Sequence, residues 1–208
     1  MKNILKIPSL LFALMLIISS CGNETKSEAK SDADIALMIP NIEKPEGWFD
    51  GNFDNQKEKL KQILERNKYT DELFEELEDG NDIVLNLYSK YDVSKYAGVS
   101  PTINLMLRKN IDKFNLEDLF NQGSLMTEVM KEMGFEEYTL LKNEYTNLPN
   151  GTKAVKQKFT YKIPNRIEKI TSTIYFYFIS EKSYVQLSLS CVDNEDCDEV
   201  FNKVLENL

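Results

Sequence analysis

The sequence TKAVKQKFTYKIPNRIEKITSTIYFYFISEKSYVQLSLSCV, residues 152–192, decides the fold of this chain. It predicts three consecutive strands, over Thr152–Ile163, Ile167–Ile179 and Tyr184–Val192. Mostly apolar residues recur at every second position, which is the period of a strand with one buried face. The connections between the strands are short and contain turn-forming residues. Strands joined in this way predict an antiparallel meander.

The middle strand of the meander carries bulky side chains on both faces. One face has Ile170, Ile174, Phe176 and Phe178, and the other has Tyr175 and Tyr177. A sheet that is apolar on both faces needs cover on both sides. A closing amphipathic helix over Asn194–Leu208 supplies one cover, through Phe201 and Leu205, and earlier helices supply the other. We therefore expect an α+β fold: an α/β/α sandwich on a mainly antiparallel sheet.

Upstream of the meander the pattern predicts further strands and helices. The expected strands are Ile83–Tyr88, Thr102–Arg108 and Glu137–Asn143; the expected helices are Asp54–Asn67, a short one from Thr70 to Leu77, and a longer one that begins after Asn115 and ends at Gly134. Asn115 is a favourable N-cap with Asp118 at the N3 position. Gly123 lies inside the longer helix, where glycine weakens the expectation of one unbroken helix.

The N-terminus has the features of an export signal. Lys2 and Lys6 precede an apolar run, Leu10–Ile18, which is far shorter than the roughly 20 residues of a membrane span. The run ends in Ile18-Ser19-Ser20-Cys21, which resembles the bacterial lipobox. That resemblance implies cleavage before Cys21 and attachment of diacylglycerol to its thiol. We expect a signal peptide over residues 1–20, a lipidated Cys21 with a polar tether to residue 40, and a single domain over residues 41–208.

A lipidated cysteine fixes the expected location of the protein. Two or more acyl chains hold a protein stably on a bilayer. The membrane, reached through the lipid anchor, is therefore one expected partner, and the cell envelope is the expected compartment. Gly22 does not supply the Asp that favours inner-membrane retention in enterobacteria, so the outer membrane is favoured where a cell has two.

Composition excludes several classes of function. The chain has 34 acidic against 25 basic residues, a net charge of −9, which does not suit nucleic acid. It contains no histidine, which excludes Ser-His-Asp and Cys-His catalysis and nearly all catalytic zinc sites. No glycine-rich phosphate loop is present. We expect no catalytic residue, no metal and no cofactor.

Cys191 and Cys197 are the only cysteines besides Cys21. They flank a short loop on inward-facing positions, so an oxidising envelope favours a disulfide between them. Two separate buried thiols are the alternative.

Two other groups of residues admit a functional and a structural interpretation. The acidic residues Asp193, Glu195, Asp196, Asp198 and Glu199 could bind calcium, but they lack an EF-hand spacing and fit a helix start with Asp193 as the N-cap. Tyr161, Tyr175 and Tyr177 could line a peptide or glycan groove, or a helix could cover them.

The order of elements resembles that of the PsbP-like lipoprotein families. The resemblance rests on Pro45-Glu46-Gly47-Trp48, on the middle helices, on the meander from Thr152, and on a closing strand-then-helix with Tyr184-Val185-Gln186-Leu187-Ser188 and Phe201-Asn202-Lys203-Val204-Leu205. Two helices directly after Trp48 depart from the family pattern. The resemblance implies a non-enzymatic scaffold that binds or assists other proteins, and it supplies no catalytic residue.

These observations favour a lipid-anchored, non-catalytic binding or assembly-assisting domain whose partner is another envelope protein. Two alternatives stay open. A carrier of a small ligand or lipid would have a continuous internal apolar cavity, and a carboxylate-based envelope hydrolase would have a deep acidic cleft.

Overall fold

The computed structural model describes residues 40, 42–51 and 82–208. The expected signal peptide, Cys21, nearly all of the tether and the two helices expected between residues 54 and 77 lie outside the described residues. The described elements are β1 (Phe49–Asp50), β2 (Asp82–Ser89), β3 (Thr102–Lys109), α4 (Leu116–Glu132), β4 (Glu136–Asn147), β5 (Lys153–Lys162), β6 (Lys169–Ser180), β7 (Ser183–Val192) and α5 (Asp198–Glu206).

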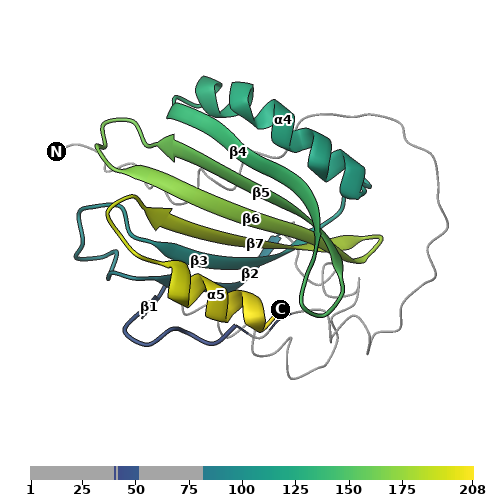
Figure 1. The fold of residues 1–208 in the computed structure, drawn as a ribbon, viewed down its shortest axis with the longest axis horizontal. Coiled ribbons are helices and arrows are strands. Elements are labelled where there is room, and N and C mark those ends of the chain that lie inside the picture. The colour runs from purple at the N-terminus through teal and green to yellow at the C-terminus, as the bar shows by residue number, and fades with distance from the viewer. Residues whose placement is uncertain (1–39, 41, 52–81) are drawn as a thin grey trace.

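The strands form one seven-stranded sheet in the order β1-β2-β3-β7-β6-β5-β4 (Figure 1). Every pair of neighbours is antiparallel, so the expected antiparallel sheet and the α+β class are confirmed. The meander β5-β6-β7 forms as predicted. The β2-β3 hairpin joins the free side of β7, with Leu105 opposite Leu187, and this makes β7 an interior strand.

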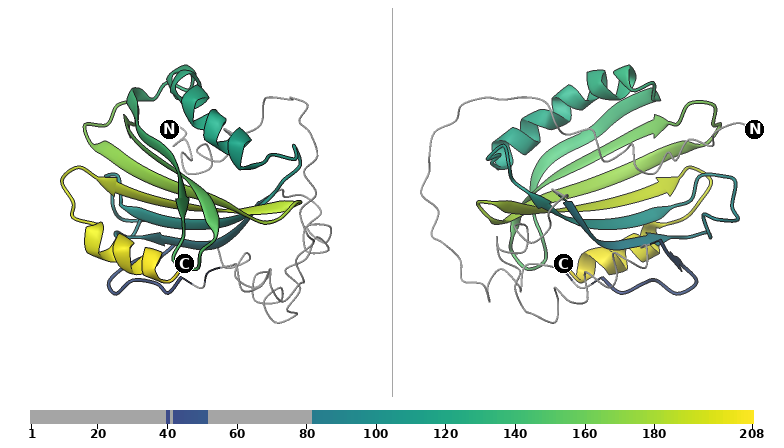
Figure 2. Two further views of the ribbon diagram at one scale, coloured as in Figure 1. Left: turned by 45° about the vertical axis from the view of Figure 1, so that its right-hand side comes forward. Right: turned by 180° about the vertical axis from the view of Figure 1, so that it is seen from behind.

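The two described helices pack on opposite faces of the sheet (Figure 2). On the α5 face, Val204 and Leu208 are buried against a core of strand residues: Ile103, Leu105, Leu107, Tyr177, Val185 and Leu187. On the α4 face, Leu119 packs against Val155 and Phe176. The alternation of β6 divides its side chains between these two cores, as the sequence predicted, because successive residues of a strand point to opposite faces.

Helix α4 begins where its capping residues predicted. The Asn115 side chain accepts hydrogen bonds from the backbone N–H groups of Glu117 and Asp118, and Asp118 accepts one from Asn115 in return. The helix runs without a break to Glu132, and Gly134 follows it with a φ of 83°.

Gly123 does not interrupt α4, because its role is close packing. A Cβ at this position would lie 2.7 Å from Gln157 Nε2 and 2.9 Å from Asn143 Nδ2. Those two amides donate hydrogen bonds to the α4 carbonyls of Leu119 and Phe120, at 2.9 Å and 2.8 Å. The glycine therefore lets the helix backbone approach the sheet closely enough for these bonds.

Two predicted boundaries were wrong by four residues. Helix α5 begins at Asp198 instead of Asn194, and Cys197 rather than Asp193 occupies its N-cap position, without a side-chain capping bond. The bond between Cys197 and Cys191 holds the chain in a turn up to that point. Strand β4 extends to Asn147, four residues beyond the predicted end, because its hairpin partner β5 continues the ladder to Lys153.

Candidate functional site

Three connections meet at one end of the sheet, on the left in Figure 1. They are the β2–β3 loop (residues 90–101), the β5–β6 turn (residues 163–168) and the β7–α5 connection (residues 193–197), and together we call them the loop end. Antiparallel topology brings them together, because β2, β5 and β7 all finish at this end.

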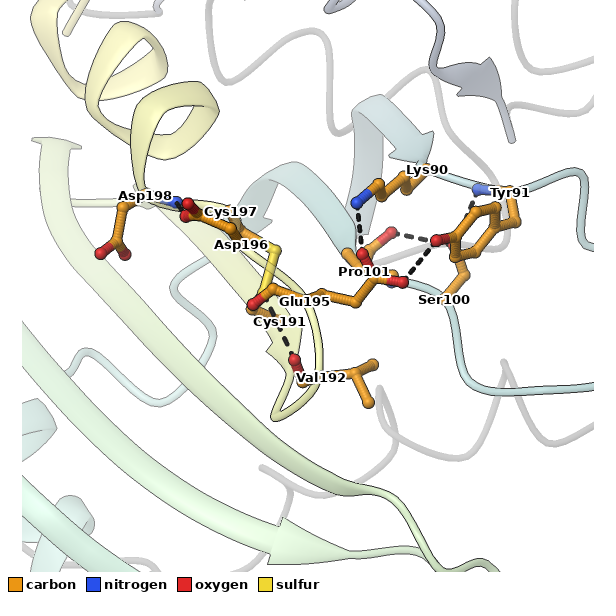
Figure 3. Close-up of a disulfide and its surroundings, with 10 residues drawn as sticks. All are labelled: Lys90, Tyr91, Ser100, Pro101, Cys191, Val192, Glu195, Asp196, Cys197 and Asp198. Carbon is orange, nitrogen blue, oxygen red and sulfur yellow. Dashed lines mark hydrogen bonds and ion pairs between the residues drawn. A yellow bond between two sulfur atoms is a disulfide. The ribbon is translucent and has the colours of Figure 1, made fainter.

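A disulfide closes the β7–α5 connection. Cys191 is the last but one residue of β7 and Cys197 precedes α5, and the structure joins their sulfur atoms (Figure 3). Their Cα atoms are 6.1 Å apart, within the range of roughly 4.4–6.8 Å that a disulfide needs. The closed ring holds Glu195 near its middle, and this carboxylate points toward the β2–β3 loop (Figure 3).

Glu195 connects the ring to the β2–β3 loop. Its two oxygens accept hydrogen bonds from Lys90 Nζ and from the Tyr91 hydroxyl. These bonds, the Lys90 bond first, lower the pKa of the Glu195 carboxyl. The bond to Glu195 also raises the pKa values of Lys90 and Tyr91. Around neutral pH the carboxylate and ammonium are therefore charged and the phenol is protonated, so each group holds the others in place.

The β2–β3 loop is further fixed by its own contacts and by the β5–β6 turn. The rings of Tyr91 and Tyr96 pack with centroids 4.4 Å apart. Gly98 allows this arrangement, since a Cβ there would lie 2.7 Å from the Tyr96 ring. Arg166 Nη1 donates a 2.6 Å hydrogen bond to the carbonyl of Ala97, which ties the turn to the loop.

The braced loop end presents apolar side chains to solvent. Ile167 is 90% exposed, Val93 65% and Tyr96 42%. They lie on the two connections that Arg166 links. Their setting is polar and of mixed charge, with Lys95 paired to Asp92 at 2.9 Å. Exposed apolar residues that gather into one patch within a polar rim are typical of a site of protein–protein contact.

The acidic residues and the three tyrosines that the sequence offered as candidate sites do not form binding sites among the described residues. Asp193, Asp196, Asp198 and Glu199 are exposed, and within the described part of the chain no group of three or more acidic or cysteine side chains could hold a metal ion. Tyr161, Tyr175 and Tyr177 are buried in the two cores, so the groove interpretation of these residues was wrong.

The contact of Glu195 with Lys90 and Tyr91 was not predicted. These residues are 105 and 104 positions apart in the sequence, and an isolated Lys-Tyr pair after a strand carries no signal of a distant partner. The cysteine spacing indicated the ring. The spacing could not indicate that Glu195, inside the ring, would contact the β2–β3 loop.

We expect the bond between Cys191 and Cys197 to be present in the exported protein. The double variant Cys191→Ala/Cys197→Ala should lower the free energy of unfolding by about 2 kcal/mol, because opening a short loop restores chain entropy to the unfolded state. Urea denaturation measures this. Alanine is the appropriate replacement, since serine at position 197 would introduce a new N-cap.

Alkylation of the wild-type chain is the matched control. Cys191 and Cys197 should remain unmodified in denaturant until a reductant is added. Complete labelling of both thiols without a reductant would contradict the bond.

No helix among the described residues has the length and hydrophobicity needed to cross a membrane. No family model matches the chain, and neither does any curated protein. Among solved structures, it is similar to the crystal structure of PA94 from Pseudomonas aeruginosa, a protein of unknown function. The TM-score is 0.40 and the identity 11%, over 59% of this chain and 80% of that one.

Proposed function

We propose that this protein is a lipid-anchored lipoprotein of the bacterial envelope whose domain, a PsbP-like α/β/α sandwich, binds another envelope protein without catalysing a reaction. The observation that carries the proposal is the loop end, where Ile167, Val93 and Tyr96 are exposed on connections that are held in a fixed geometry. The lipobox-like sequence ending at Cys21 supports the anchor.

The loop end suits recognition because it is arranged before a partner arrives. The disulfide ring holds Glu195, Glu195 holds Tyr91, and Tyr91 packs on Tyr96. A surface that is already ordered loses less conformational entropy on binding than a flexible one. Aromatic side chains within a polar rim are typical of the centre of a protein interface.

The same contacts favour binding over catalysis. A general acid needs a raised carboxyl pKa, and that of Glu195 is lowered. A nucleophilic or basic tyrosine needs a lowered pKa, and that of Tyr91 is raised by its bond to Glu195. Both groups are used to hold the loop end together.

Photo-crosslinking in intact cells tests this function. We place a photo-crosslinking residue at position 167 of the full-length protein and expect one discrete protein adduct, because Ile167 is the most exposed apolar residue of the loop end. Val93→Glu should reduce that adduct about tenfold, since burying a charge in an apolar contact opposes binding.

Fatty-acid labelling tests the anchor. A fatty acid carrying an alkyne should label this protein but not its Cys21→Ala variant.

The matched control is Leu125→Glu, which changes an exposed apolar residue on α4 and should leave the adduct unchanged. The binding role is contradicted if position 167 gives no adduct, or if both glutamate variants reduce it equally. An adduct to a lipid or small molecule would instead support the carrier alternative. Labelling that persists in Cys21→Ala would contradict the anchor and leave the binding result standing.

A further inference from the structure

Strand β4 forms one edge of the sheet, and it is much longer than β1, the strand at the other edge. It pairs only with β5 among the described strands, and it ends the strand order. An antiparallel edge strand has backbone N–H and C=O groups that point away from its single neighbour. Such an edge can pair with a further strand.

The second half of β4 is the regular part. The ladder with β5 shifts register between Glu136 and Thr139 and again between Leu140 and Lys142. From Lys142 to Asn147 it continues without interruption. A bulge commonly protects an edge from pairing, so the first half is protected and the second half is open to a new strand.

The open half carries charges of both signs on one face and an exposed aromatic residue on the other. Lys142 lies directly opposite Lys158 of β5, and like charges in that position are unfavourable. Tyr145, in the same half, is 55% exposed, and its ring stacks on that of Phe120 with centroids 4.8 Å apart. Glu144 lies on the same face as Lys142 and forms an ion pair with it at 2.8 Å.

We propose that two copies of this protein pair through β4, antiparallel, about a two-fold axis at Asn143. In this register Lys142 of each copy lies opposite Glu144 of the other. Both charges of each copy then face an opposite charge. The two sheets would join into one continuous sheet.

Neighbouring registers do not have this complementarity. A two-fold axis at Lys142 or at Glu144 places a charged residue opposite its own copy, which is unfavourable. An axis at Tyr145 places Glu144 opposite Thr146 and gives neither Lys142 nor Glu144 an opposite charge. The charges thus select the axis at Asn143, as isologous interfaces require a surface that is complementary to itself.

Co-purification of two differently tagged full-length copies, extracted together in mild detergent, tests the pairing. The wild-type copies should co-purify. Lys142→Glu in both copies should weaken association about tenfold, because it places a new carboxylate opposite Glu144 at two symmetric positions. The double exchange Lys142→Glu/Glu144→Lys should restore association, since it keeps every opposite pair. Thermal melting of each variant reports folding separately.

Lys142→Glu has a second expected effect that distinguishes an interface from a folding defect. It removes the contact between like charges at Lys158 but also the ion pair with Glu144, so its melting temperature should stay close to that of the wild type. Restored pairing in the double exchange supports the proposal. Wild-type copies that do not co-purify, or a double exchange that associates no better than Lys142→Glu, would overturn it. Neither result tests the proposal that the loop end binds another envelope protein.

Discussion

Leu187→Ala is expected to lower the free energy of unfolding by about 2–5 kcal/mol. Leu187 is fully buried on the interior strand β7, where it lies opposite Leu105 on one side and Tyr175 on the other. Removing its side chain leaves a cavity in the core beneath α5, and the rigid sheet can close only part of it. Urea denaturation followed by circular dichroism measures the change.

Leu125→Ala is the matched control for this substitution. It removes the same atoms from an exposed position on α4, so its effect should stay within about 0.5 kcal/mol. Equal losses for the two variants would show that β7 is not at the centre of the core.

The centre of the sheet illustrates what the sequence could and could not predict. Side-chain alternation gave the strands and their faces, because the period of a strand is a local property. It did not show that β3 pairs with β7. The register of Leu105 opposite Leu187 joins segments about eighty residues apart, and many apolar strands could occupy that place equally well.

At the start of α5, a covalent bond and contacts with distant residues override the local preference for a helix N-terminus. Asp193 followed by acidic residues satisfies the rules for a helix N-terminus, yet the helix begins at Asp198. The Cys191–Cys197 bond and the contacts of Glu195 with Lys90 and Tyr91 hold the intervening residues in a turn. Capping preferences of about 1 kcal/mol do not outweigh a covalent constraint together with an ion pair.

Gly123 is the opposite case. Glycine has a low helix propensity, and packing explains its place in α4. Glycine in a helix costs about 1 kcal/mol relative to alanine. Here it allows the amides of Asn143 and Gln157 to reach the α4 backbone. The sequence indicated only a residue that weakens a helix. The structure shows that the amides of Asn143 and Gln157 occupy the space where a Cβ would lie.

A partly buried ion pair between β2 and β3 provides the last prediction. Arg108, which is 8% exposed, donates from Nε and Nη2 to the two carboxylate oxygens of Asp82 at 2.8 Å and 2.9 Å. Its Nη1 donates to Gln186 at 3.1 Å, and the guanidinium lies 5.8 Å from the centre of the Tyr184 ring. Lysine cannot reproduce this planar, two-pronged contact.

Arg108→Met should therefore lower the free energy of unfolding by about 3 kcal/mol, because it leaves the Asp82 carboxylate without its partner in a largely buried place. Arg108→Lys should also destabilise, by a smaller amount. The double variant Arg108→Met/Asp82→Leu should recover most of the loss, since no unpaired charge remains. Urea denaturation of the three variants distinguishes these outcomes. If Arg108→Met alone is as stable as the wild type, the pair contributes nothing, and water rather than protein surrounds the carboxylate.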